Sequence, residues 1–266
     1  MDSALLLAFL VTAGAGAATA IGAALSLFPR ATNRSFLALA LGFSAGVMLY
    51  VSFVEIVPKS LSFFATTATE GLDKGFMALF FLAGLTGMAL LYRVIPDLHH
   101  PGEGESGLSI TEPIDPVLLK AGLGVAVAIT VHNFPEGLAT FFLTLEDPQL
   151  GIPVAIAIAI HNIPEGIAVA VPIYFATKKK STAIWFGVVA SIAEPLGALL
   201  GWLFLGPFMT DAVLGGLFAV VAGIMVYISV DGLLPAARQY GNGQRAIYGM
   251  IAGMAVMALS LVLFRL

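Results

Sequence analysis

The sequence predicts an all-α integral membrane protein in which eight transmembrane helices form a single domain over residues 1–266. Composition is the first reason: 59% of the residues are hydrophobic and only 11% are charged, whereas a soluble domain carries about 25% charged residues. Patterning is the second, because the apolar residues come in successive runs of about 20, the length that crosses a bilayer core of ~30 Å. Helices are expected because they satisfy their own backbone hydrogen bonds in lipid, and the short alternating strands of a β-barrel do not occur.

The expected helices follow one another with short polar breaks between them. They span Ala4–Phe28, Phe36–Val57, Gly75–Ile95, Val117–Leu143, Gly151–Phe175, Ala183–Leu205, Ala212–Pro235 and Ala246–Phe264. The first run has small residues that resemble a signal-peptide cleavage site, but the positive segment that a signal peptide needs is missing, since Asp2 is the only charge before it. We therefore expect a retained first helix.

Small residues recur inside these helices at a spacing that favours close packing. Gly42 with Gly46 in the second helix, and Gly197 with Gly201 in the sixth, are small-xxx-small pairs. In membranes such pairs let two helix backbones approach closely. We interpret them as packing devices and assign them no chemistry.

The distribution of basic residues predicts the orientation, because Lys and Arg concentrate in cytoplasmic loops. With both termini extracytoplasmic, nine of the twelve fall inside: Arg30, Arg34, Arg93, Lys120, Lys178, Lys179, Lys180, Arg238 and Arg245. Three fall outside: Lys59, Lys74 and Arg265. The one sizeable polar break, residues 96–116, is then a cytoplasmic loop, and its His99 and His100 are either part of a solvated linker or a weak metal-collecting segment.

An internal repeat is the strongest functional signal. The segment His132-Asn133-Phe134-Pro135-Glu136-Gly137 recurs 29 residues later as His161-Asn162-Ile163-Pro164-Glu165-Gly166. Within each copy, His and Glu are four apart and Asn and Glu three apart, so the three side chains share one face of a helix. Each proline leaves a backbone carbonyl unpaired and is expected to kink its helix. One helix thus presents an imidazole, an amide oxygen and a carboxylate together.

The acids inside the helices need a partner, because an ionisable group within the membrane costs about 2.5–3.5 kcal/mol. They are Glu55, Glu136, Glu165, Glu194 and Asp231, and no Lys or Arg lies deep beside them. A cationic ligand accounts for them. From a rise of ~1.5 Å per residue, both motifs and Glu194 lie roughly 15 Å below the outer surface, near the membrane midplane.

Two imidazoles, two amides and three carboxylates exceed what one tetrahedral zinc ion uses, so we predict a binuclear site bridged by Glu136 and Glu165. One ion would bind His132, Glu136, His161 and Glu165, and the other Asn133, Glu136, Asn162, Glu165 and Glu194. Nitrogen and oxygen ligands suit zinc, iron(II), manganese, cobalt and cadmium alike. The chain has no cysteine, so thiolate ligands are excluded.

For each of three further residues the sequence is consistent with two roles. Met48 is either core filler or a thioether ligand, and Glu55 is either an entrance ligand or a carboxylate that reaches the outer surface. Asp231 is either an exit ligand or a charge at a helix end.

These motifs resemble the ZIP (Zrt/Irt-like) family of metal transporters, most closely its bacterial zinc-transporter branch. The likeness extends over the chain through both HNxPEG motifs and through Ser44–Met48, Ser52–Pro58, Ala193-Glu194, Ala222–Val226 and Ser229–Asp231. The resemblance implies an eight-helix, multi-pass protein of the bacterial inner membrane that carries divalent metals into the cytoplasm. It implies a metal pair at Asn133, Glu136, His161, Asn162, Glu165 and Glu194, with His132 beside them. One departure is Gly232, where that branch tends to carry Glu.

We therefore expect a transporter that binds Zn²⁺ or Fe²⁺ as substrate, without a prosthetic group and without a nucleic-acid partner. A homodimer is left open. A zinc-dependent intramembrane hydrolase is the alternative, because His and Glu around a metal also activate water, but no separate intramembrane base accompanies the motifs. A metal sensor would need an output domain, which the sequence does not show.

Overall fold

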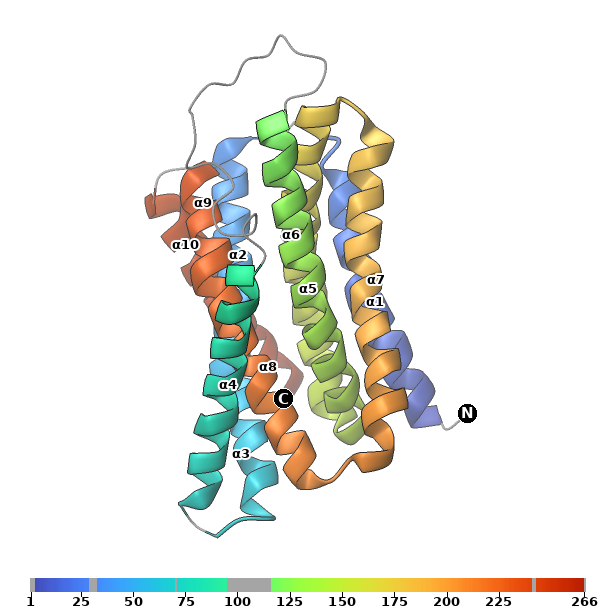
Figure 1. The fold of residues 1–266 in the computed structure, drawn as a ribbon, viewed down its shortest axis with the longest axis vertical. Coiled ribbons are helices and arrows are strands. Elements are labelled where there is room, and N and C mark those ends of the chain that lie inside the picture. Colours follow the sequence, from blue (N-terminus) through green and yellow to red (C-terminus); the bar gives the residue numbers. More distant parts are fainter. Residues whose placement is uncertain (1–2, 29–32, 70, 95–115, 241–242, 266) are drawn as a thin grey trace.

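The computed structural model describes residues 3–28, 33–69, 71–94, 116–240 and 243–265, and all regular structure in these segments is helical (Figure 1). The elements are α1 (Ser3–Leu25), α2 (Arg34–Val51), η1 (Ser52–Ile56), α3 (Val57–Ala65), α4 (Leu72–Val94), α5 (Pro116–Glu146), α6 (Pro148–Thr177), α7 (Lys180–Leu205), η3 (Gly206–Phe208), α8 (Asp211–Tyr227), η4 (Ile228–Leu233), α9 (Leu234–Tyr240) and α10 (Gly243–Arg265). Each of the eight expected segments overlaps one long helix or several helices that follow one another without a break, and the first expected segment runs three residues past the end of α1 at Leu25.

Seven helices in the described segments are long and apolar enough to cross a membrane. They are Ser3–Leu25, Ser35–Ala65, Leu72–Arg93, Pro148–Thr177, Lys180–Phe208, Asp211–Arg238 and Gly243–Val262. The 31-residue α5 is not among them. It carries the first HNxPEG motif. The polar loop with His99 and His100 lies outside the described residues.

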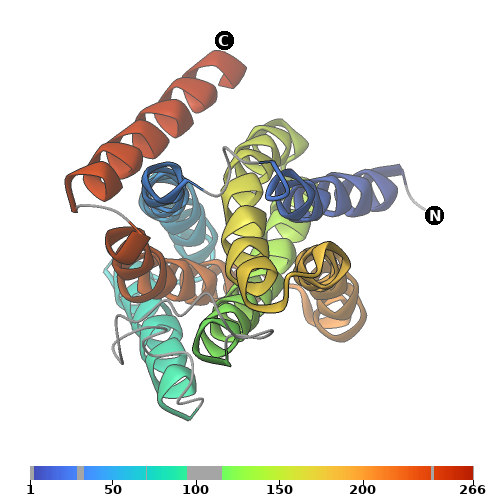
Figure 2. The same cartoon turned by 90° about the horizontal axis from the view of Figure 1, so that it is seen from above.

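The helices pack as two groups that meet along a seam. In one group α1 and α7 pack on each other and on α5 and α6. In the other, α2 packs on α10 and α4 packs on α8, and Figure 2 shows α10 on the outer side of α2. The contact of α2 with α6 forms most of the seam, and a smaller contact of α5 with α8 adds to it.

Glycines make these contacts possible because they let backbones touch. A Cβ atom on Gly42 or Gly46 of α2 would collide with the backbone of α10 at Ala246 or Met250. A Cβ atom on Gly249 or Gly253 of α10 would likewise collide with the backbone of α2. The expected role of Gly42 and Gly46 in packing is confirmed.

Two of the long helices contain a π-helical segment, in which one extra residue is accommodated in a turn. In η1 this segment holds Glu55, and in η4 it holds Asp231. Such segments re-aim the side chains that follow them and frequently mark functional sites. Both were expected as uninterrupted helices, since nothing in the apolar spacing signals the extra residue.

Candidate metal centre

The two motifs lie side by side at mid-height of the bundle, on α5 and α6. Both helices continue through their motif proline, Pro135 in α5 and Pro164 in α6. The glycine after each Glu is needed for a neighbouring helix: a Cβ on Gly137 would collide with the backbone of Glu194 in α7, and one on Gly166 with the Thr19 carbonyl in α1. The motif glycines therefore bring α7 and α1 against the site.

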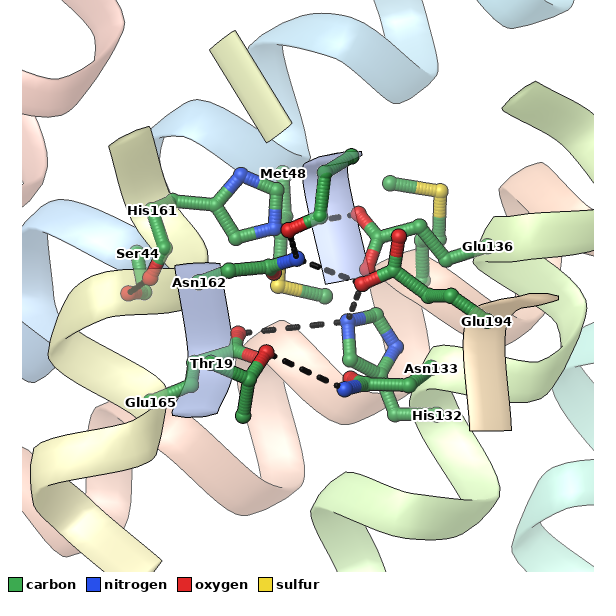
Figure 3. A network of polar contacts seen from close by, with 12 residues as sticks. Thr19, Ser44, Met48, His132, Asn133, Glu136, His161, Asn162, Glu165 and Glu194 are labelled. Carbon is green, nitrogen blue, oxygen red and sulfur yellow. Dashed lines mark hydrogen bonds and ion pairs between the residues drawn. The ribbon is translucent and has the colours of Figure 1, made fainter. Parts of the chain in front are cut away.

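The predicted ligands are all buried together. His132, Asn133, Glu136, His161, Asn162, Glu165 and Glu194 are each 0–1% exposed. Figure 3 shows these seven side chains pointing toward one another from α5, α6 and α7. The structure thus brings every predicted ligand to one place.

Imidazole nitrogens and carboxylate oxygens stand at distances that suit a shared cation. His161 Nε2 lies 3.0 Å from a Glu136 oxygen. His132 Nε2 lies 3.4 Å from the other Glu136 oxygen and 3.9 Å from Glu165. Two ligands of one tetrahedral zinc ion, each about 2.0–2.1 Å from the metal, stand about 3.3 Å apart. Nitrogen or oxygen atoms of His132, His161 and Glu165 all fall within 4.8 Å of one another.

A backbone contact fixes how His161 presents its ring. Its Nδ1 lies 3.2 Å from the Ala157 carbonyl oxygen, which can only accept a hydrogen bond. The proton of the neutral ring therefore belongs on Nδ1, and the Nε2 lone pair faces the Glu136 carboxylate. Two lone pairs at this distance repel each other unless a metal ion or a proton lies between them.

Both asparagines are held with the amide oxygen free. The Asn133 NH2 group donates to the Ala190 carbonyl at 3.1 Å and to the Thr19 hydroxyl at 3.4 Å. The Asn162 NH2 group donates to the Ala15 carbonyl at 3.0 Å and also to Glu194. Because the nitrogens are used in this way, each oxygen is left facing the site as an acceptor.

The role of α1 was not predicted from the sequence. Thr19 and the Ala15 carbonyl orient the two asparagines, although α1 carries no ionisable group at this depth. The helix has two buried threonines, Thr12 and Thr19, and nothing in the sequence distinguishes Thr19 from Thr12. Backbone carbonyls leave no signal in the sequence.

The site has many buried acceptors and almost no donors. The side-chain atoms without a hydrogen-bond partner are both nitrogens of His132, Nε2 of His161, Oδ1 of Asn133 and Asn162, both oxygens of Glu136 and Glu165, and one oxygen of Glu194. Buried polar groups are ordinarily paired, because an unpaired one costs about 1–3 kcal/mol. Among the described residues, the ion pairs of these carboxylates involve only histidines. A buried cluster in which most lone pairs accept no hydrogen bond is suited to bind cations.

The residues with two interpretations lie in different surroundings. Met48 is fully buried and lies among the site groups in Figure 3, so its position is compatible with either core packing or thioether ligation. Glu55 is 4% exposed and does not reach the surface. Asp231 is exposed and accepts a hydrogen bond of 2.8 Å from the Tyr227 hydroxyl. Ser44 of α2 donates across the seam to the His161 carbonyl at 2.9 Å.

The fold and the site together define a class of protein: a multi-pass helical membrane protein with buried nitrogen and oxygen ligands at the centre of its bundle. Comparison with known proteins specifies the class further. A family model described as ZIP Zinc transporter matches residues 99–261. The chain belongs to the ZIP family.

Bacterial relatives match over nearly the whole length. The chain is 51% identical to the zinc transporter ZupT of Nitratidesulfovibrio vulgaris, with 99% of both chains covered. It is 46% identical to ZupT of Streptococcus mutans over 99% of this chain and 100% of the relative, and 50% identical to ZupT of Chlorobium luteolum over 96% and 97%. These relatives are named as transporters and not as enzymes, so the hydrolase alternative finds no support. The expected resemblance and the multi-pass bacterial membrane location are confirmed.

Proposed function

We propose that the protein carries divalent transition-metal ions, zinc in particular, across the bacterial inner membrane into the cytoplasm. One observation carries the proposal: a buried cluster of imidazole, amide and carboxylate groups leaves most of its acceptor atoms without a hydrogen-bond partner. Relatives named as zinc transporters agree with that chemistry. Iron(II), manganese, cobalt and cadmium are further substrates, because ligands of this kind discriminate poorly among them.

We assign the ligands to two ions bridged by the carboxylates of Glu136 and Glu165. The first ion binds His132, Glu136, His161 and Glu165, whose ligand atoms converge. The second binds Asn133, Asn162 and Glu194 together with the bridging carboxylates. The free oxygens of both asparagines and of Glu194 support this second position.

The orientation follows from the basic residues, with eight membrane crossings that include α5 and with both termini extracytoplasmic. The membrane potential then supplies the driving force. At 100 mV, negative inside, a divalent ion moving inward gains roughly 4.6 kcal/mol, which corresponds to an accumulation of about three orders of magnitude. Uptake of this kind needs no nucleotide hydrolysis.

The test is metal uptake by the full-length chain in proteoliposomes with an imposed potential. We expect zinc to accumulate inside, and to do so faster when the interior is made negative. Parallel vesicles with a pH gradient report whether protons are exchanged. Zinc entering no faster than in protein-free vesicles, with the protein folded and inserted, would refute the proposal.

A further inference from the structure

Ser44 of α2 uses its hydroxyl on a residue of the metal centre. Its side chain is fully buried, and the hydroxyl donates to the His161 carbonyl at 2.9 Å across the seam (Figure 3). A buried serine in a helix ordinarily bonds the carbonyl one turn back, as Ser52 does with the Met48 carbonyl at 2.8 Å. The Ser44 bond instead joins two segments that are 117 positions apart in the sequence.

The turn of α6 that receives this bond is weakened by a proline. Pro164 lies three residues after His161 and has no N–H group, so it cannot donate to the carbonyl of Ile160, the residue before His161. The helix nevertheless continues through Pro164. In membranes, Ser and Thr side chains of neighbouring helices supply hydrogen bonds where a proline interrupts a helix. Ser44 supplies such a donor at the turn that carries a predicted ligand.

The hydrogen bond fixes the position of α6 along α2 in a way that apolar packing does not. Leu37 of α2 forms a small apolar cluster with Ile167 and Val171 of α6. Apolar contacts have no preferred direction, so the two helices could slide on them. A hydrogen bond requires a defined length and direction. The glycine contacts with α10 hold α2 in place, so Ser44 sets where the His161 turn lies along α2.

We propose that Ser44 is a positioning residue of the metal centre, whose bond to the His161 carbonyl fixes where the His161 imidazole meets Glu136. The inference rests on the proposed metal binding at this centre. The ring is held at a second point, because its Nδ1 lies 3.2 Å from the Ala157 carbonyl oxygen, and its Nε2 then lies 3.0 Å from Glu136. A ligand whose backbone and ring are both held loses less freedom when the ion binds.

The test is equilibrium zinc binding to the purified full-length chain. Ser44→Ala removes the hydroxyl, and we expect zinc affinity to fall by roughly twofold to tenfold, the effect of one lost hydrogen bond. Ser60→Ala is the matched control, because Ser60 is equally buried and its hydroxyl also bonds a carbonyl of another helix, that of Gly215 at 2.7 Å, outside the metal centre. The control should melt like Ser44→Ala but bind zinc like wild type.

A double-mutant cycle separates positioning from general packing. In a His161→Ala background the main-chain carbonyl is still present, but there is no imidazole to place. Ser44→Ala should then change zinc affinity by less than twofold, whereas a packing role would lower it as much as in the wild-type background.

Three results would each overturn the inference: wild-type affinity in Ser44→Ala, an equal loss in Ser60→Ala, or an undiminished loss in the His161→Ala background. If Ser44→Ala does not insert, Ser44→Cys provides the same comparison, because a thiol is only a weak donor. Wild-type protein that binds no zinc would instead overturn the proposed function.

Discussion

Replacing Glu136 by glutamine should affect the metal centre more than any other change of similar size. The substitution keeps the shape of the side chain but removes the charge that faces both imidazoles, at 3.0 Å from His161 and 3.4 Å from His132. In the shared-carboxylate model Glu136 contacts both ions, and a contact that involves a charged group contributes about 1.5–3 kcal/mol. Two such contacts amount to about 3–6 kcal/mol, so we expect zinc affinity to fall by roughly 10² to 10⁴-fold.

The assay is equilibrium zinc binding to purified protein, together with uptake into proteoliposomes. Glu146→Gln is the matched control, since Glu146 is an exposed acid at the end of the same helix. The control should bind and transport zinc like wild type, whereas Glu136→Gln should insert normally and transport none. Two zinc ions bound by Glu136→Gln with an affinity within threefold of wild type would refute the shared-carboxylate model.

Three further predictions concern selectivity, packing and pH. Three substitutions should each remove one bound ion and shift the preference between zinc and iron(II), because oxygen ligands leave while imidazole stays: Asn133→Ala, Asn162→Ala and Glu194→Gln. An unchanged transport profile with two bound ions would count against the second position. Gly166→Ala should lower the free energy of unfolding by about 1–3 kcal/mol, as overpacking does, because its Cβ would meet the Thr19 carbonyl. Gly14→Ala should melt like wild type, because a Cβ there would meet nothing within 4 Å. Zinc affinity should weaken from about pH 7.5 to 5.5 and binding should release protons, because protons compete for the same carboxylates and imidazoles; a flat titration without proton release would contradict this.

The sequence predicted the helical segments and the residues that gather at the candidate site, because both depend on local spacing. His132 and Glu136 share a helical face whatever the rest of the chain does, and the repeat at His161 placed a second set opposite. The parts that were missed depend on contacts between distant segments. Thr19 meets Asn133 across 114 positions of sequence, and no spacing rule reveals that. The burial of Glu55 was likewise undecided, because it depends on the π-helical segment η1 and on the helices packed around it.

The short connection between α5 and α6 has a consequence for which mutations the chain can accept. A single residue, Asp147, separates the two helices, and its side chain accepts a hydrogen bond from Leu150 N at 3.2 Å. The two motifs are thus joined by continuous helix on both sides of a fixed turn. Inserting or deleting one residue between Glu136 and His161 would rotate one motif by about 100° and shift it by about 1.5 Å relative to the other. The length of this hairpin fixes how the two motifs face each other. We therefore expect selection to remove length changes there, whereas the other loops at the membrane surfaces can vary in length.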